Sequence, residues 1–263
     1  MSKFAWKTFA LYAPDELELA FKDVSESKYD GIEVGVDEAQ NTKKLEMLSM
    51  KYGLQVACVT SGFMNSPDSV SYTKKAIDLC NSLGVKYTLY LPPLRNTLSW
   101  QQFIAHTRDV CKYADEKGVV PTVHHHTGTL VETLEDSERF LHDVGMENLG
   151  ICFDTAHAEL FSDPVEWVNR LSEGIRYVHV KDLTKTGGKP KIVKEQVTLG
   201  SNEYKSISTN FTDLGEGAID FKGIFSALRN NCYDGWVSVE MEVQRVSRKE
   251  HLRKNLSILK IYS

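Results

Sequence analysis

The sequence has 263 residues, of which 41% are hydrophobic and 25% charged, as in an ordinary globular protein. Its net charge of -5 argues against a non-specific nucleic-acid binder, and no apolar run approaches the roughly 18 residues of a membrane span. Pro14 comes too early for the apolar core of a secretory signal, and the five cysteines are widely spaced without a C-x-x-C pair. We therefore expect a cytoplasmic protein without disulfides, which binds neither nucleic acid nor membranes.

Short β-rich segments alternate with amphipathic segments along the whole chain. The expected strands are residues 4–10, 31–35, 54–60, 85–91, 119–126, 149–154, 175–182 and 236–240. The expected helices are residues 14–27, 45–52, 69–83, 99–117, 134–144, 164–172, 221–230 and 249–261. Eight such repeats predict an α/β fold, a (β/α)8 TIM barrel that forms a single domain over residues 1–263. The alternative, a doubly wound open sheet, would place a glycine-rich turn after its first strand, and this chain has none there.

One connection is unusually long. Residues 183–220 separate the seventh strand from its helix and are rich in Lys, Thr, Gly and Ser. Long loops in compact domains are usually functional or disordered, and in a barrel this one lies on the face that carries the active site. We expect it to be a lid.

Ionisable side chains stand at the ends of several otherwise apolar strands. They are Glu33, His124, His125, His126, Asp154, His179, Lys181 and Glu240. Because the carboxyl ends of barrel strands converge on one rim, these residues should become neighbours in space. Buried charges are costly unless they pair or bind a cation, so the pattern predicts a site at this rim.

The residue types point to a metal. Asp154 and His157 are spaced so that both can reach one ion, and with His179 and Glu240 they form a mixed carboxylate and imidazole set that suits Mn²⁺ or Co²⁺. Cysteine is absent from these positions, which argues against a structural zinc site. Strand alternation should send His124 and His126 into the barrel and His125 outward.

The sequence leaves other roles open. Lys181 could bind a substrate hydroxyl or pair with Asp182 or Glu33, and Glu33 could bind substrate or orient a ligand. Trp6 and Phe9 could form an apolar wall against a sugar, although core packing is the commoner role of such residues.

Phosphate binding has little support. The glycine pair Gly215 and Gly217 lacks the pattern of a phosphate loop, and Arg95 and the lysines of residues 185–194 read as solvated charges. We expect an unphosphorylated substrate.

Several segments together resemble a known family. VHHHTGT, ICFDTAH, YVHVKDL, LGEGAIDF and GWVSVE resemble the xylose-isomerase-like barrel superfamily of sugar isomerases, epimerases and endonuclease IV, and within it most closely the inosose dehydratases. The resemblance implies one divalent ion, Mn²⁺ or Co²⁺ before Zn²⁺ or Mg²⁺, held by Asp154, His179, Glu240 and a residue of strand five. Many relatives have glutamate there, whereas this chain has His124. The ketose epimerases of the superfamily use two facing glutamates, so this departure disfavours a two-base epimerase.

The resemblance implies a metal-dependent lyase that dehydrates a keto-cyclitol or related keto-sugar through an enolate. Glu240 or a histidine of strand five would be the base, His126, His157 or Lys181 the acid, and Glu33, Trp6, His126 and Lys181 candidates for substrate binding. The alternatives are a ketose isomerase or epimerase, elimination at a 3-keto-glycoside, and a non-catalytic sugar-binding barrel. An endonuclease IV-like enzyme would need more metal ligands and a basic rim. Homo-oligomers are common among such barrels.

Overall fold

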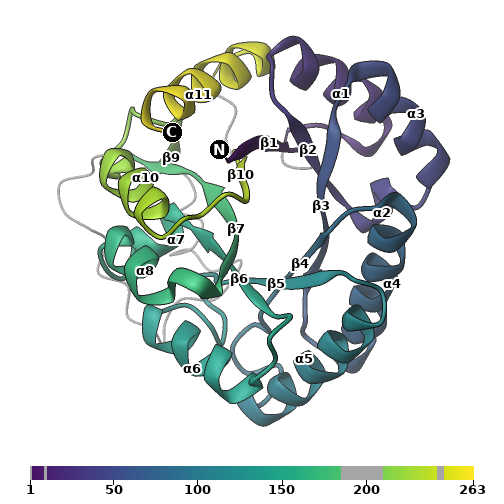
Figure 1. Ribbon diagram of the computed structural model, residues 1–263, viewed down its shortest axis with the longest axis vertical. Helices are drawn as coiled ribbons and strands as arrows, with labels where there is room; N and C mark the ends of the chain where they lie inside the picture. The colour runs from purple at the N-terminus through teal and green to yellow at the C-terminus, as the bar shows by residue number, and fades with distance from the viewer. Residues whose placement is uncertain (1, 9–10, 185–209, 242–245) are drawn as a thin grey trace.

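The computed structural model describes residues 2–8, 11–184, 210–241 and 246–263. Parallel strands close into a barrel in the order β1-β10-β7-β6-β5-β4-β3-β2, with the helices outside the ring (Figure 1). The barrel strands are β1 Lys3–Lys7, β2 Gly31–Gly35, β3 Gln55–Phe63, β4 Tyr87–Leu91, β5 Val120–His124, β6 Gly150–Asp154, β7 Ile175–Val180 and β10 Trp236–Val239. The predicted (β/α)8 barrel is confirmed.

The helices follow the strands in the predicted order. They are η1 Pro14–Glu16, α1 Leu17–Glu26, α2 Val36–Ala39, α3 Thr42–Tyr52, α4 Pro67–Leu83, α5 Trp100–Asp115, α6 Leu134–Val144, α7 Thr155–Glu159, α8 Pro164–Leu171, η2 Ser172–Gly174, α10 Phe221–Asn230 and α11 Arg248–Tyr262. Their ends have local causes: the Ser99 side chain accepts the Gln102 N–H at the start of α5, and Gly53 ends α3 with a left-handed φ of 66°. Two short helices, α2 and α7, were not predicted.

Four strands, β1, β5, β7 and β10, end before their predicted limits, and for two of them the structure shows the reason. Strand five stops at His124, because the His126 N–H bonds the Val131 carbonyl in the following turn instead of a neighbouring strand. Strand seven stops at Val180, and Asp182–Leu183 (β8) then pairs antiparallel with Phe211–Thr212 (β9). These short strands are the described ends of the long connection. Residues 185–209, on which the predicted lid depends, lie outside the described part of the chain.

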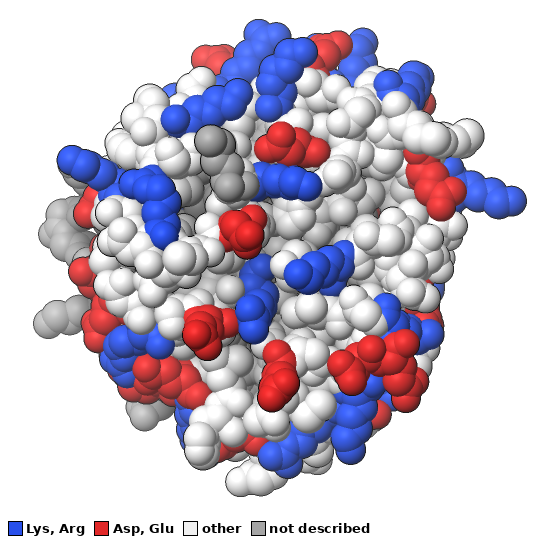
Figure 2. All heavy atoms as spheres, in the orientation of Figure 1, with Lys and Arg blue, Asp and Glu red and all other residues white. Residues whose placement is uncertain are grey.

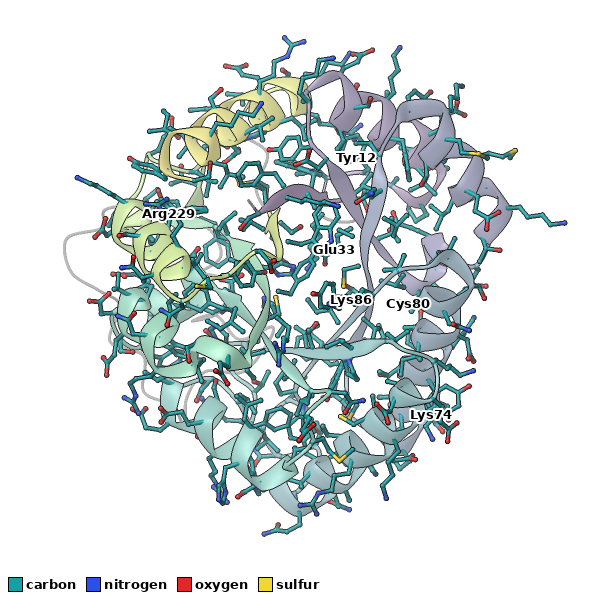
Figure 3. The ribbon with its side chains drawn as sticks, viewed as in Figure 1. Tyr12, Glu33, Lys74, Cys80, Lys86 and Arg229 are labelled. Atoms are coloured by element: carbon teal, nitrogen blue, oxygen red, sulfur yellow. The ribbon has the colours of Figure 1, made fainter. Side chains whose placement is uncertain are left out.

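Alternate residues of the strands face opposite sides of the barrel wall. One set fills the barrel interior below the rim: Ala5, Ala57, Cys58, Leu89, Cys152 and Tyr177. The other set packs against the helices in the main core. Figure 3 shows Glu33 inside the ring of strands, whereas Lys74 and Arg229 lie on the surrounding helices. Side chains at the strand ends that share the inner face are therefore gathered at one place.

The surface carries both signs of charge. On the face shown in Figure 2, Lys and Arg are interspersed with Asp and Glu. Among the described residues, no helix is both long and apolar enough to cross a membrane.

Candidate metal centre and active site

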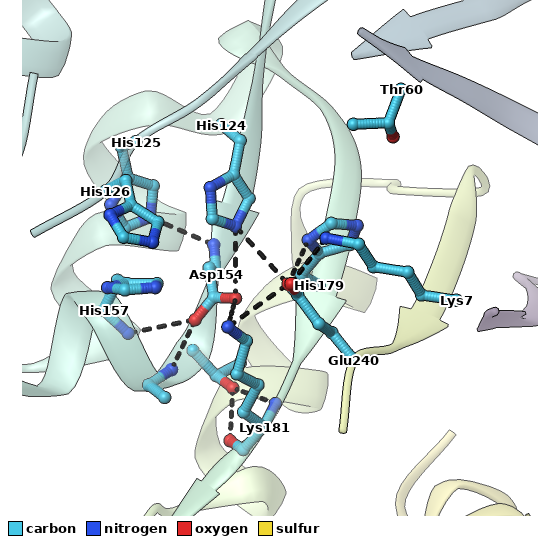
Figure 4. A network of polar contacts seen from close by, with 12 residues as sticks. Lys7, Thr60, His124, His125, His126, Asp154, His157, His179, Lys181 and Glu240 are labelled. Carbon is cyan, nitrogen blue, oxygen red and sulfur yellow. Dashed lines mark hydrogen bonds and ion pairs between the residues drawn. The ribbon is translucent and has the colours of Figure 1, made fainter. Parts of the chain in front are cut away.

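Four buried side chains from four different strands converge at the rim. His124 ends β5, Asp154 ends β6, His179 lies in β7 and Glu240 directly follows β10 (Figure 4). One ligand atom from each lies within 4.8 Å of all the others. The Nε2 atom of His124 is 3.3 Å from Asp154 Oδ2 and 3.7 Å from Glu240 Oε2, and His179 Nδ1 is 2.9 Å from the same Glu240 oxygen. The structure thus brings together the four predicted ligands.

Asp154 is fixed by the helix that follows it. Its Oδ1 atom accepts the backbone N–H groups of Ala156 and His157 and so caps α7. The other oxygen, Oδ2, faces His124. One carboxylate therefore starts a helix and contributes to the ligand cluster.

His179 is oriented by a carboxylate behind it. Its Nε2 atom lies 2.8 Å from Oε2 of Glu33, and the Thr60 hydroxyl donates to Glu33 Oε1 at 2.9 Å. Burial alone would raise the pKa of Glu33, but the charges of His179 and Lys7 lower it to about 2. An ionised Glu33 accepts the Nε2–H and leaves His179 Nδ1 for the cluster, an arrangement common behind metal-bound histidines. Because Glu33 is fully buried, the structure favours the ligand-orienting role over contact with substrate.

Two buried lysines form ion pairs with the two carboxylate oxygens of Glu240. Lys7 Nζ lies 2.5 Å from Oε1, and Lys181 Nζ lies 3.2 Å from Oε2 and 3.7 Å from Asp154 Oδ2. Burial would raise the pKa of Glu240, but the charges of Lys181, Lys7 and His179 hold it well below its usual range. Lys7 was missed in the sequence, although it ends the apolar strand β1 just as the predicted residues end theirs.

The donor atoms fit a divalent ion. Two imidazoles and two carboxylates form the mixed N and O set expected for Mn²⁺, Co²⁺ or Zn²⁺. The buried His179 Nδ1 and Glu240 Oε2 lie 2.9 Å apart without hydrogen-bond geometry, and the further contacts of this oxygen within the described part of the chain are Lys181 Nζ at 3.2 Å and His124 Nε2 at 3.7 Å. A cation shared between them would satisfy both atoms.

Cys152 lies beside two of these ligands. It lies two residues before Asp154 in β6 and therefore faces the same side of the strand. Its sulfur, with one nitrogen each of His124 and His179, forms a second group of close ligand atoms. The sequence analysis considered only the strand-end positions, where cysteine is absent, and missed Cys152, which the strand alternation could have revealed.

The three consecutive histidines have different surroundings. His125 points away from the cluster, stacks on Trp167 with ring centroids 4.3 Å apart, and accepts the Asp154 backbone N–H at Nε2. The rings of His126 and His157 lie 4.0 Å apart, and burial lowers the pKa of both well below the usual range. Both are therefore neutral imidazoles near pH 7.

A cavity of about 490 Å³ opens over the cluster. Lys7, His126 and Glu240 lie in its lining, and Tyr12, Phe63 and Tyr72 line it further out. These outer residues come from β3 and from segments after β1 and β3, in the first half of the chain. The metal-ligand cluster comes from residues 124–240. Another cavity, of about 380 Å³, opens among residues at the amino ends of β4, β5 and β7, away from the cluster.

Other predicted roles need correction. Trp6 is not a substrate wall: it is fully buried in the outer core, where its ring meets Tyr29 edge to face at 5.9 Å. β1 turns Trp6 towards the helices because Lys7, the next residue, faces inward. Phe9 lies outside the described residues. Lys181 contacts Asp154 and Glu240 instead of the predicted alternatives Asp182 and Glu33.

Asp182 and Arg95 take part in loop structure. The Asp182 carboxylate accepts the backbone N–H groups of Gly215 and Gly217, which gives this glycine pair a structural role. Arg95 is paired with the buried Glu132, and the lysines of residues 185–194 lie outside the described residues.

The fold agrees with a comparison to known protein families. The family model described as "Xylose isomerase-like TIM barrel" matches residues 21–262, and the chain belongs to this family. Among curated proteins it is similar to the inosose dehydratase of Geobacillus kaustophilus (strain HTA426), with 25% identity over 88% of this chain and 80% of that protein. It is also similar to the inosose dehydratase of Clostridium botulinum (strain Alaska E43 / Type E3), with 33% identity over 56% of this chain and 48% of that protein. The chain thus spans about half the length of that second relative.

Solved structures share the fold at low sequence identity. The D-allulose 3-epimerase from Methylomonas sp. has a TM-score of 0.79 and 16% identity, and the comparison covers 100% of this chain and 98% of that one. The IOLI protein with a bound zinc atom has a TM-score of 0.78 and 18% identity over 99% of both chains. The probable 3-DHS dehydratase AsbF from Bacillus anthracis has a TM-score of 0.77 and 18% identity over 98% of both. At such identities these likenesses establish the fold.

Proposed function

We propose that this chain is a divalent-metal-dependent carbon–oxygen lyase that removes water from a keto-cyclitol or a related keto-sugar. The observation that carries the proposal is the make-up of the site. The four-residue ligand cluster receives the imidazole of His124, and no carboxylate, from β5, and two neutral histidines lie beside it. The inosose dehydratases among the curated relatives support the same activity.

His124, Asp154, His179 and Glu240 would hold the ion, for which we expect Mn²⁺ or Co²⁺. When bound, such an ion acts as a Lewis acid that polarises a carbonyl oxygen and so acidifies the neighbouring C–H bond. Lys7 and Lys181 add positive charge beside the same carboxylates. This favours negative charge that develops on a substrate oxygen.

The chain must then supply two proton transfers. A base removes the proton next to the carbonyl, and an acid protonates the hydroxyl one carbon further on, which leaves as water. Glu240 is a poor candidate for the base, because the charges of Lys181 and Lys7 hold its pKa well below the usual range. His126 lines the cavity and is neutral, and His157 stands next to it.

The test uses purified protein loaded with Mn²⁺ or Co²⁺ and incubated with 2-keto-myo-inositol in D₂O. Metal-dependent loss of water to a diketone, followed by proton NMR, would support the lyase. Deuterium uptake without water loss would assign the protein to the isomerases instead. Asp154→Asn is the matched control, because its remaining carbonyl oxygen can still cap α7 while the ligand charge is lost.

An epimerase of ketoses is the second candidate, favoured by Glu240, whose carboxylate lines the cavity. If the missing second glutamate decides between the two activities, His124→Glu should raise epimerisation of a ketose relative to water loss. An unchanged ratio in a metal-loaded, folded variant would show that β5 does not decide the reaction. A panel of 3-keto-glycosides tests elimination at that related substrate class.

A further inference from the structure

Helix α2 adds a carboxylate to the wall of the cavity over the cluster. Asp37 lies on this helix and lines the cavity beside Tyr72. The Tyr72 hydroxyl donates to Oδ1 of Asp37 at 3.0 Å, and Nε2 of Gln40 donates to the same oxygen at 2.9 Å. The other oxygen, Oδ2, makes no hydrogen bond or ion pair with any residue in the described ranges. Two donors therefore orient this carboxylate and leave one of its oxygens as an acceptor.

The neighbouring residue fixes helix α2 to the barrel. Oε2 of Glu38 accepts the backbone N–H of Gly35 at 2.7 Å and lies 3.0 Å from the hydroxyl of Thr8. Gly35 ends β2, and Thr8 directly follows β1. The ends of two strands thus hold the short helix, and with it Asp37, in one place.

The hydroxyl groups of the described cavity wall already act as donors within the protein. They belong to Tyr12, Thr60, Ser61 and Tyr72, and they donate to Asp23, Glu33, Thr73 and Asp37, respectively. Ser61 is the donor to Thr73, because the Thr73 hydroxyl donates its one hydrogen to the Ser69 carbonyl. These hydroxyl oxygens can still accept, so they add acceptors to the wall that a ligand meets.

The charges of the cavity wall are unevenly placed. Lys7 is the only lysine or arginine among the described residues that line it, and its ammonium group is paired with Glu240 at the cluster. The divalent ion that we expect would add its positive charge at the same place. Further out, beside Tyr72, the described wall carries the carboxylate of Asp37 and no cation. An anionic group of a ligand would therefore meet a like charge there.

We propose that Asp37 selects neutral substrates: its Oδ2 atom accepts a hydrogen bond from a substrate hydroxyl, and its charge rejects a carboxylate or phosphate at the same position. The inference rests on the proposed function and narrows its substrate to a polyhydroxylated keto compound without an anionic group. A hydroxyl can donate to Oδ2, whereas an ionised carboxylate has only acceptor atoms. Specificity thus comes from attraction of one class of ligand and repulsion of another.

Asp37→Asn should weaken or reverse this preference. Tyr72 and Gln40 both donate to the position of Oδ1, so the amide oxygen should take this place and the amide NH₂ group the place of Oδ2. The variant then presents an uncharged donor instead of a charged acceptor. A hydroxyl can accept from this donor, so a neutral ligand should bind at most about tenfold more weakly. An anion gains a donor and loses a like charge, so it should bind at least about tenfold more tightly.

The test compares a neutral keto-cyclitol, 2-keto-myo-inositol, with an anionic one, 3-dehydroquinate. Mn²⁺-loaded protein broadens the proton NMR signals of a ligand that binds near the ion. Titrations recorded within the first minutes give both affinities before water loss proceeds. We expect wild-type protein to bind the neutral ligand at least about tenfold more tightly than the anion. In Asp37→Asn this ratio should shift at least about tenfold towards the anion.

Asp68→Asn is the matched control. It removes one charge from the first turn of α4, outside the described cavity wall. Because an exposed charge is screened by salt, this variant should leave the ratio within about twofold of wild type.

An unchanged ratio in folded, Mn²⁺-loaded Asp37→Asn, or an equal shift in Asp68→Asn, would overturn the role of Asp37. Tighter binding of the anion than of the neutral ligand by wild-type protein would overturn it as well. Water loss by wild type with an unchanged ratio in Asp37→Asn would support the proposed function and remove only this inference. Selective binding without any water loss would do the reverse. If wild-type protein binds neither ligand, both fail.

Discussion

At the residue scale, Lys7 determines how much positive charge the ligand cluster already contains. Its ammonium group is buried against Glu240, so it partly neutralises the site before any ion arrives. Lys7→Met should raise the affinity for Mn²⁺ severalfold, since a like charge is removed. In metal-free protein it should lower the free energy of unfolding by about 3 kcal/mol, because a buried ion pair is broken. Metal titration and urea unfolding measure the two effects.

Lys7→Arg is the control, since it keeps the charge and should leave Mn²⁺ affinity within about twofold of wild type. Weaker ion binding in Lys7→Met than in Lys7→Arg would contradict the electrostatic role. It would indicate that Lys7 acts mainly by positioning Glu240.

His125 should make stability depend on pH. Burial lowers its pKa to about 3, while in the unfolded chain it titrates near 6.5. Between these values the unfolded state binds one more proton than the folded state. The stability contribution is therefore complete above pH 6.5 and is lost, by about 1.4 kcal/mol per pH unit, as the pH falls towards 3. Urea unfolding of metal-free protein at pH 7, 6 and 5 measures this slope.

His125→Gln is the comparison, because its amide oxygen can still accept the Asp154 N–H but does not titrate. The variant should be less stable at pH 7 and its slope should be shallower by one proton. Parallel pH curves for the two proteins would show that His125 does not titrate in this way.

At the element scale, the connection between β8 and α10 is built around one carboxylate. Asp182 accepts N–H groups from Leu183, Gly215, Gly217 and Ile219, immediately after Lys181. A Cβ atom on Gly217 would lie 2.1 Å from Asp182 Oδ1 and from the Leu183 carbonyl oxygen. This turn therefore helps to fix the backbone that carries Lys181.

Gly217→Ala should lower the free energy of unfolding by about 3 kcal/mol through this overlap. Gly53→Ala is the matched control: its Cβ would meet open space, and only the left-handed φ of 66° opposes it, at about 1 kcal/mol. Chemical unfolding compares the two. If Gly217→Ala costs no more than Gly53→Ala, the turn is looser than its contacts indicate.

Elements with a strong local pattern could be predicted, and those formed by tertiary contacts could not. The helix Leu134–Val144 was predicted to the residue, because a Thr133 cap and Gly145 mark its ends. The helix Thr155–Glu159 was missed because it is short and depends on capping by Asp154, a residue predicted as a metal ligand. Trp6 was misplaced because two faces of β1 are both buried, and hydrophobicity alone does not say which one faces the lumen.

At the scale of the whole molecule, ion binding should stabilise the fold, since its ligands come from β5, β6, β7 and the residue after β10. An ion at 100 times its dissociation constant adds about 2.7 kcal/mol. For a protein of this size this raises the midpoint of thermal unfolding by roughly 5–10 °C. Thermal unfolding with and without Mn²⁺, Co²⁺ or Zn²⁺ measures the shift, and Asp154→Asn should abolish most of it. An equal shift in that variant would place the ion elsewhere.

The assembly of the site could be predicted because the barrel forces it. Asp154, His179 and Glu240 are far apart in the sequence, yet the carboxyl ends of parallel strands in a closed barrel all lie at the same rim. The sequence could not reveal which partner each atom of a side chain contacts. That one oxygen of Glu240 contacts Lys7 while the other contacts both Lys181 and His179 depends on side-chain torsions set by tertiary packing.

The separation of the cluster from the outer cavity wall has an evolutionary consequence. The outer wall comes from β3 and from segments that follow β1 and β3, whereas the ligands and both neutral histidines come after residue 123. New substrates can therefore be explored by changes before residue 124 while the reactive segment is inherited intact, provided that Lys7 and Glu33, which contact Glu240 and His179, are kept. A chimera that joins the segment before residue 124 of one family member to the remainder of another, with these two residues kept, should take its substrate preference from the former and its reaction from the latter.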